Sequence, residues 1–144
     1  MSGSTTLSVI VPVYNEQYLV QESLSRLQVL GESPLLSRVK VIVVDDHSTD
    51  QTPMTLQRFQ QCFEENFGRG KFEWLFLRHD RNQGKGASIR TGLKHADTEL
   101  VVIHDADLEY HPRDLLKMIP LFLEEDADVV FGSRFFHYRT LFFC

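Results

Sequence analysis

The sequence predicts an α/β domain in which helices cover both faces of a mostly parallel sheet. Short β-branched apolar runs alternate with longer stretches of helical spacing along the whole chain. Several of these runs carry apolar residues on both faces, as a buried parallel strand requires. Alternating strands and helices of this kind form a doubly wound, Rossmann-like sheet. Because 144 residues suit one domain, we expect residues 1–144 to form a single domain.

The elements follow from the spacing of apolar residues and from the residues that flank each run. The expected strands are residues 7–13, 39–44, 72–77, 99–104 and 128–131. The expected helices are residues 16–30, 51–66, 85–95 and 113–124. Residues 48–50 (STD) offer side chains that can cap the second helix, and Pro112 suits the start of the fourth.

Composition and charge narrow the class of protein. The chain is 42% apolar and 24% charged, with a formal net charge of −5 and scattered basic residues, which argues against a nucleic-acid partner. Its two cysteines, Cys62 and Cys144, lack metal-ligand spacing and fit a reducing compartment. Residues 1–6 lack the basic start of a signal peptide, and no run reaches the roughly 18 apolar residues of a membrane span. We therefore expect a cytoplasmic location.

Polar residues follow each of the first four expected strands, where parallel strands place their ligands. They are residues 12–16 (PVYNE), 45–50 (DDHSTD), 81–86 (RNQGKG) and 105–109 (DADLE). Any one group has a structural explanation, because Asp, Asn and Gly commonly end strands and cap helices. For Asp45 and Asp46 alone, structure and function are equally good explanations. The four groups together favour a site at one edge of the sheet.

The most informative group is Asp105-Ala106-Asp107, which directly follows a hydrophobic run. In an extended chain, residues two apart lie on one side, about 6 to 7 Å from each other. Two carboxylates so placed repel each other unless a hard divalent cation such as Mg2+ or Mn2+ lies between them. Glu109 continues the same parity and is a candidate third metal ligand, or equally a solvated loop carboxylate.

Lys85 lies between two glycines at the start of an expected helix, where backbone N–H groups and an ammonium can meet a phosphate. The spacing matches neither the dinucleotide fingerprint nor the P-loop. The alternative is that Gly84 and Gly86 only ease the turn from strand to helix.

Five blocks of the sequence, in order, resemble those of the family 2 glycosyltransferases. They are residues 8–16 (SVIVPVYNE), 43–50 (VVDDHSTD), 82–86 (NQGKG), 105–108 (DADL) and 132–135 (GSRF). Within the family, the resemblance is closest to dolichol-phosphate mannose synthases and bacterial polyprenyl-phosphate glycosyltransferases.

The resemblance implies a glycosyltransferase A fold and a role for each matched residue. The residues it implies around the nucleoside are Pro12, Tyr14, Glu16, Val44 and Asp46. Those it implies at the metal and the diphosphate are Asp105, Ala106, Asp107, Glu109 and Arg134. Asp107 and Arg134 would have the catalytic role, since a metal ion and a guanidinium stabilise the charge that develops on a leaving diphosphate.

The reaction implied is metal-dependent transfer of mannose or glucose, with inversion, from GDP-mannose or UDP-glucose to a dolichyl or polyprenyl phosphate. A lipid phosphate is already anionic and needs little help from a general base. Relatives continue well beyond the GSRF block, so we expect this chain to be the donor-binding part, truncated at its carboxyl end and inactive alone. We expect the full-length protein to touch the membrane surface from the cytoplasm.

Other classes of protein share parts of this pattern. A haloacid-dehalogenase-like phosphotransferase would use Asp105 as a nucleophile, although such motifs normally open the domain. A signalling receiver would use Asp45 or Asp46, although its acidic pair follows the first strand and here follows the second. A non-catalytic nucleotide-sugar-binding fragment is the third alternative.

Overall fold

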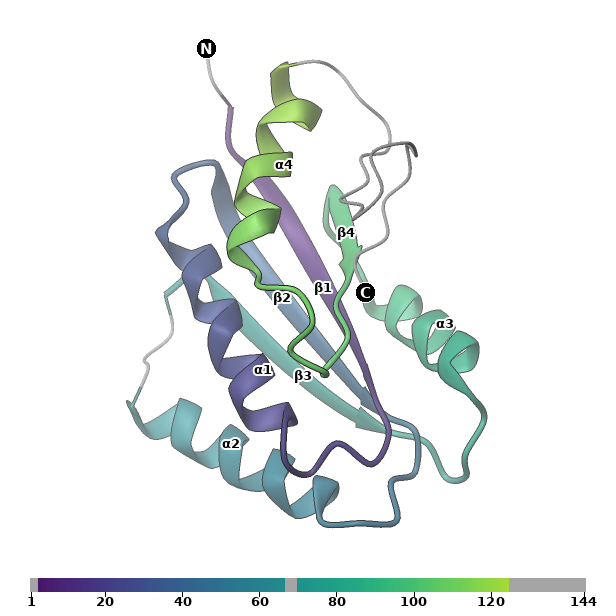
Figure 1. The fold of residues 1–144 in the computed structure, drawn as a ribbon. Coiled ribbons are helices and arrows are strands. Elements are labelled where there is room, and N and C mark those ends of the chain that lie inside the picture. The colour runs from purple at the N-terminus through teal and green to yellow at the C-terminus, as the bar shows by residue number, and fades with distance from the viewer. Residues whose placement is uncertain (1–2, 67–69, 125–144) are drawn as a thin grey trace.

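The computed structural model describes residues 3–66 and 70–124, which form a sheet with helices on both faces (Figure 1). The strands are β1 (Thr5–Val13), β2 (Leu36–Asp45), β3 (Phe72–Arg78) and β4 (Leu100–Ile103). The helices are α1 (Val20–Arg26), the 3-10 helix η1 (Leu27–Glu32), α2 (Thr52–Asn66), α3 (Lys85–His95) and α4 (Arg113–Glu124). The predicted fold class is confirmed. The expected strand at 128–131 lies outside the described residues.

The sheet has the strand order β3-β2-β1-β4, and each pair of neighbours is parallel. From β1 to β3 the chain adds strands in one direction, and then it crosses back to place β4 on the other side of β1. In a doubly wound sheet, such a reversal opens a crevice beyond the carboxyl ends of the two strands that flank it. The topology therefore places a crevice beyond β1 and β4.

Alternation along β1 divides the core between the two faces of the sheet. Val9, Val11 and Val13 belong to the larger cluster, which also contains buried residues of α1, η1, α2 and α4. Ile10 points to the opposite face, where α3 packs against the sheet. A Cβ at Gly92 of α3 would lie only 2.6 Å from Ile10 Cγ2, so the helix approaches the strand as closely as a glycine allows. Figure 1 shows α1, α2 and α4 together in front of the sheet.

The first helix is shorter than the sequence predicts. It begins at Val20 instead of residue 16 and changes to a 3-10 helix at Leu27. Residues 17–19 form a turn before it, and the loop ahead of that turn contains Asn15, whose left-handed φ of 51° belongs to no helix. Glu16 also donates its backbone N–H to Thr52 Oγ1 at 2.9 Å, which ties the loop to the start of α2.

The other helices begin close to where the sequence places them. Asp50 Oδ1 accepts the backbone N–H of Thr52 at 2.8 Å, so the predicted cap of α2 is confirmed with Asp50 as the capping side chain. Pro112 immediately precedes α4, as predicted. Over residues 3–66 and 70–124, no helix combines the length and apolar character needed to span a bilayer.

Candidate functional site

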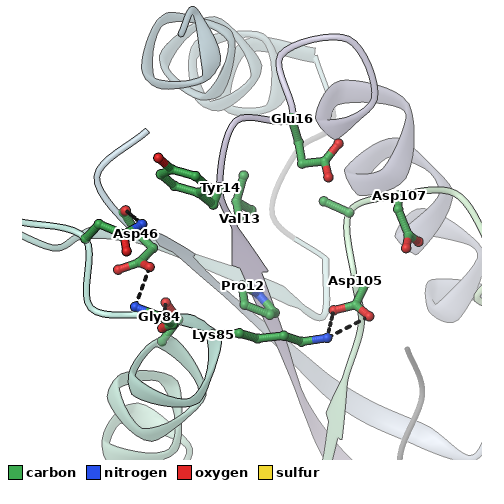
Figure 2. Close-up of a pocket in the computed structure, with 12 residues that line it drawn as sticks. Pro12, Val13, Tyr14, Glu16, Asp46, Gly84, Lys85, Asp105 and Asp107 are labelled. Atoms are coloured by element: carbon green, nitrogen blue, oxygen red, sulfur yellow. Dashed lines mark hydrogen bonds and ion pairs between the residues drawn. The ribbon is translucent and has the colours of Figure 1, made fainter. Parts of the chain in front are cut away.

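A pocket of about 460 Å³ opens beyond the carboxyl ends of the strands, at the crevice that the topology predicts (Figure 2). All four polar loops of the sequence contribute to it. The lining residues are Pro12, Val13, Tyr14, Glu16, Asp46, Asn82, Gly84, Lys85, Ser88, Asp105, Ala106 and Asp107. The volume falls within the range of small-molecule sites. The structure therefore gathers residues up to 95 positions apart in the sequence into one cavity.

Three carboxylates share one side of the pocket: Glu16 after β1, and Asp105 and Asp107 after β4 (Figure 2). The pKa of Glu16 is raised, first by burial and then by the negative charges of Asp107, Asp50 and Asp105. Asp105 and Asp107 therefore lie near enough to Glu16 for their negative charges to act on it. Such a group favours the arrival of a cation.

The chain at Asp105-Ala106-Asp107 is not extended, which corrects the premise from which the pair was predicted. β4 ends at Ile103, and Leu108 has a left-handed φ of 64°. Asp107 Oδ1 accepts the backbone N–H of Glu109 at 3.1 Å, so the segment turns. Both carboxylates still line the same pocket. Glu109 loses the predicted parity and is not among the lining residues.

Lys85 reaches across the pocket from the first residue of α3 to Asp105 (Figure 2). Its Nζ lies 2.8 Å from Asp105 Oδ1 and 3.0 Å from Oδ2, so the ammonium contacts both oxygens. The predicted cationic residue of the site and the first predicted metal ligand are therefore partners in this structure.

The donor set suits a hard divalent cation that is shared with a ligand. Within the described part of the chain, no three His, Cys, Asp or Glu side chains form a ready-made metal site. Asp105 and Asp107 would hold the ion, and a diphosphate and water would complete its coordination, as is usual for Mg2+ beside nucleotides. The gathering of Glu16, Asp105 and Asp107 on this side of the pocket supports a cation there.

Asp46 lines the opposite wall, but its carboxylate is engaged from inside the protein. Oδ1 accepts the backbone N–H of Gln83 and Oδ2 that of Gly84, each at 2.8 Å. His79 Nδ1 lies 2.8 Å from Oδ1. Burial would raise the pKa of Asp46, but the hydrogen bonds from His79, Gln83 and Gly84 outweigh it and lower the pKa. Asp46 therefore holds the 82–84 loop that forms the rim of the pocket.

Val44 and Arg134 are not among the residues that line the pocket in the described part of the chain. Val44 is fully buried and packs with Ile10 and Ile42 on the α3 face, so its side chain does not line the pocket as expected. Successive side chains of a strand point to opposite faces of the sheet. Val44, which precedes Asp45 at the end of β2, therefore points away from the larger core cluster. Arg134 lies outside the described residues.

Asn15 was not predicted as a site residue, yet it organises the first loop of the pocket. Its Oδ1 accepts the backbone N–H groups of Thr49 at 2.8 Å and Asp50 at 3.3 Å, and its own N–H donates to Ser48 Oγ at 2.9 Å. These bonds hold the loop between Tyr14 and Glu16 against the loop after β2. The sequence carried one signal of this, since Asn is among the few residues that readily adopt a left-handed conformation.

Asp45 is also turned inward, which bears on the receiver alternative. Its Oδ1 accepts hydrogen bonds from the N–H and the hydroxyl of Ser48, and Arg78 Nε lies 3.3 Å from Oδ2. Asp45 and Asp46 are both buried, and internal partners engage both carboxylates. Neither carboxylate is therefore presented to a phosphodonor. The structure does not favour a receiver.

The parallel sheet and the polar pocket at its switch point define an α/β domain with a ligand crevice at the carboxyl edge of its sheet. The sequence model of the family described as "Glycosyl transferase family 2" matches residues 8–144. The chain belongs to this family, as its sequence blocks predicted.

Relatives and solved structures agree with this assignment. The chain is 31% identical over 124 residues to an undecaprenyl-phosphate 4-deoxy-4-formamido-L-arabinose transferase of Pseudomonas syringae, covering 86% of this chain and 34% of the relative. It is 28% identical over 129 residues to a dolichol-phosphate mannosyltransferase of Pyrococcus furiosus, covering 90% and 33%. The chain thus spans about a third of the length of these relatives.

Among solved structures, a mannosyltransferase from Pyrobaculum calidifontis in complex with GDP-Man and Mn2+ superimposes with a TM-score of 0.66 at 28% identity, covering 82% of this chain and 32% of that one. S. aureus TarS 1-349 in complex with UDP-GlcNAc superimposes with a TM-score of 0.63 at 26% identity, covering 90% and 35%. The fold is therefore the glycosyltransferase A fold.

Proposed function

We propose that this chain forms the donor-binding part of a metal-dependent, inverting glycosyltransferase that transfers a hexose from a nucleoside diphosphate sugar to a dolichyl or polyprenyl phosphate. The observation that carries the proposal is the meeting of Glu16, Asp105, Asp107 and Lys85 in one pocket at the switch point of a family 2 domain. Relatives named as transferases to dolichol phosphate and undecaprenyl phosphate support the class of acceptor. We place the reaction at the cytoplasmic face of a membrane.

Each wall of the pocket has a distinct task in this proposal. The loop of Pro12, Tyr14 and Glu16 holds the nucleoside, with half-exposed Tyr14 offering an aromatic face. Asp105 and Asp107 hold the divalent ion. That ion, when bound, neutralises the diphosphate and makes it a better leaving group. Lys85 and the N-terminus of α3 face the same phosphates with positive charge.

Charge must be stabilised where the bond to the anomeric carbon breaks. The departing diphosphate gains negative charge, so the ammonium of Lys85 stabilises it more strongly in the transition state than in the ground state. We propose the same task for Arg134, on the resemblance of residues 132–135 to the family block. An anionic acceptor phosphate attacks from the opposite face of the sugar, and the configuration inverts.

Metal-dependent nucleotide binding tests this proposal without requiring turnover. GDP-mannose and UDP-glucose are titrated into the 144-residue chain by calorimetry, with and without Mn2+. We expect one of them to bind only with Mn2+ and Asp107→Asn to abolish that binding. Asp114→Asn is the matched control, because Asp114 pairs with Lys117 on α4 and does not line the pocket.

Two outcomes would contradict the proposal. Equal binding with and without Mn2+ would remove the metal role of Asp105 and Asp107. Covalent trapping of beryllofluoride on Asp105 would instead favour a phosphotransferase in which that carboxylate is the nucleophile.

A further inference from the structure

The ion pair between Lys85 and Asp105 occupies the side of the pocket to which we assign the metal. Lys85 Nζ contacts both carboxylate oxygens of Asp105, at 2.8 and 3.0 Å. The Asp105 side chain is 15% exposed and that of Lys85 is 52% exposed, so the acid is fixed in the wall and the lysine extends over it. Figure 2 shows the lysine chain spanning the pocket from α3 to the loop after β4.

Because the ammonium of Lys85 contacts both oxygens of Asp105, it competes with a divalent ion for that carboxylate. Like charges a few ångströms apart repel strongly in a partly desolvated site. A metal ion that binds Asp105 therefore breaks the two-oxygen contact of Lys85 and pushes its ammonium away. The Asp105 side chain is much less exposed than that of Lys85. Ser23 Oγ also donates to the Asp105 backbone carbonyl at 3.4 Å, so the lysine is the member that moves.

Lys85 has a second position available when a diphosphate is present. It is the first residue of α3, and the N–H groups at a helix start favour an anion beside them. Its flexible four-carbon stem can turn the ammonium from Asp105 to a phosphate oxygen without moving the helix. Metal alone gives the displaced lysine no new anion, whereas metal with a diphosphate does.

We propose that Lys85 is an exchangeable counterion: it neutralises Asp105 in the empty pocket and transfers its ammonium to the diphosphate when the metal takes Asp105. This inference rests on the proposed function and adds a consequence to it. Lys85 opposes binding of the metal alone and supports binding of the diphosphate, so it couples the two ligands positively.

The test is a pair of affinities that must change in opposite directions. In Lys85→Met, affinity for Mn2+ alone, measured from the free-ion electron paramagnetic resonance signal, should rise about three- to fivefold, the usual value of one partly exposed ion pair. Affinity for GDP or UDP at saturating Mn2+, measured by calorimetry, should fall roughly tenfold or more, as expected for loss of a charged hydrogen bond. Lys85→Gln should show the same two signs.

Two controls separate this exchange from a general charge effect. Lys94→Met removes an exposed positive charge from the last turn of the same helix and should leave both affinities unchanged. Lys85→Arg keeps the charge and should keep the affinity for Mn2+ alone close to that of the wild type.

Failure of the Lys85 exchange and failure of the proposed function give different results. If the wild type binds Mn2+ and nucleotide, but Lys85→Met and Lys85→Gln weaken both ligands or leave Mn2+ affinity unchanged, the counterion exchange is wrong and the donor site stands. If the wild type binds neither Mn2+ nor nucleotide, the proposed function fails and the exchange fails with it.

Discussion

The carboxylate of Asp46 accepts the backbone N–H of Gly84 at 2.8 Å and so joins the end of β2 to the start of α3. The same carboxylate accepts the N–H of Gln83 and contacts His79 Nδ1, whose other ring nitrogen lies 2.8 Å from Thr91 Oγ1 on α3. The loop that precedes Lys85 is thus held in place by a buried carboxylate from another segment of the chain.

Asp46→Asn should destabilise the fold although it barely changes the size of the side chain. An amide has one accepting oxygen, so its NH2 group would face a backbone donor that the carboxylate now satisfies. We expect a loss of about 2 to 3 kcal/mol in the free energy of unfolding, measured in urea. Asp80→Asn, an exposed change next to His79, should cost almost nothing. Equal stability of the two variants would show that the Asp46 bonds are not needed.

Gly84→Ala should cost stability through backbone strain alone. Gly84 has φ 96° and ψ 164°, a region used almost only by glycine, and a Cβ there would meet nothing within 4 Å. We expect a loss of about 1 to 3 kcal/mol in thermal or urea unfolding. Gly86→Ala, two residues further on, should be neutral or stabilising, because a Cβ there meets only the end of Arg90 at 3.4 Å. A cost at Gly86 equal to that at Gly84 would argue against the strain.

Substitutions of Asn15 should separate its backbone role from its hydrogen bonds. Asn15→Gly keeps the left-handed conformation and loses the bonds to Thr49 and Asp50, whereas Asn15→Ala loses both. Alanine should therefore be less stable than glycine by about 1 kcal/mol. Both should bind nucleotide more weakly, because the loop presents Tyr14 and Glu16 to the pocket. Unchanged nucleotide affinity in both variants would show that this loop does not depend on Asn15.

Stability should fall below neutral pH because of His104. Burial lowers the pKa of this histidine from 6.5 to about 4, with Asp105 and Asp107 opposing the shift. Above pH 6.5 both folded and unfolded states are neutral, and this contribution to stability is fully present. As the pH falls from 6.5 to about 4, only the unfolded chain takes up the proton, so stability is lost progressively, by roughly 3 kcal/mol at most, and the loss then levels off.

The measurement is urea unfolding of the metal-free chain from pH 7.5 to 4, compared with His104→Gln. The variant should be less pH-sensitive over that window, because glutamine has no proton to gain. Parallel pH profiles for the two proteins would mean that His104 does not titrate differently on unfolding.

Local pattern determined most of the fold. Continuous apolar runs predicted the buried strands, helical spacing predicted α2, α3 and α4, and the order of the elements predicted a parallel sheet with a site at its carboxyl edge. The family assignment followed from short blocks at those strand ends and is confirmed over residues 8–144. These features are legible in sequence because burial and periodicity act over a few neighbouring residues.

Tertiary structure decided which predicted residues meet. Only folding showed that Lys85 contacts Asp105, that the Asp46 carboxylate is engaged by a loop 38 residues away, and that Val44 faces the core. It also shortened the first helix, where Glu16 is tied to Thr52 in the preceding loop, and turned the chain at Asp107, where Leu108 adopts a left-handed conformation. Such contacts depend on partners remote in the chain, and no local pattern records them.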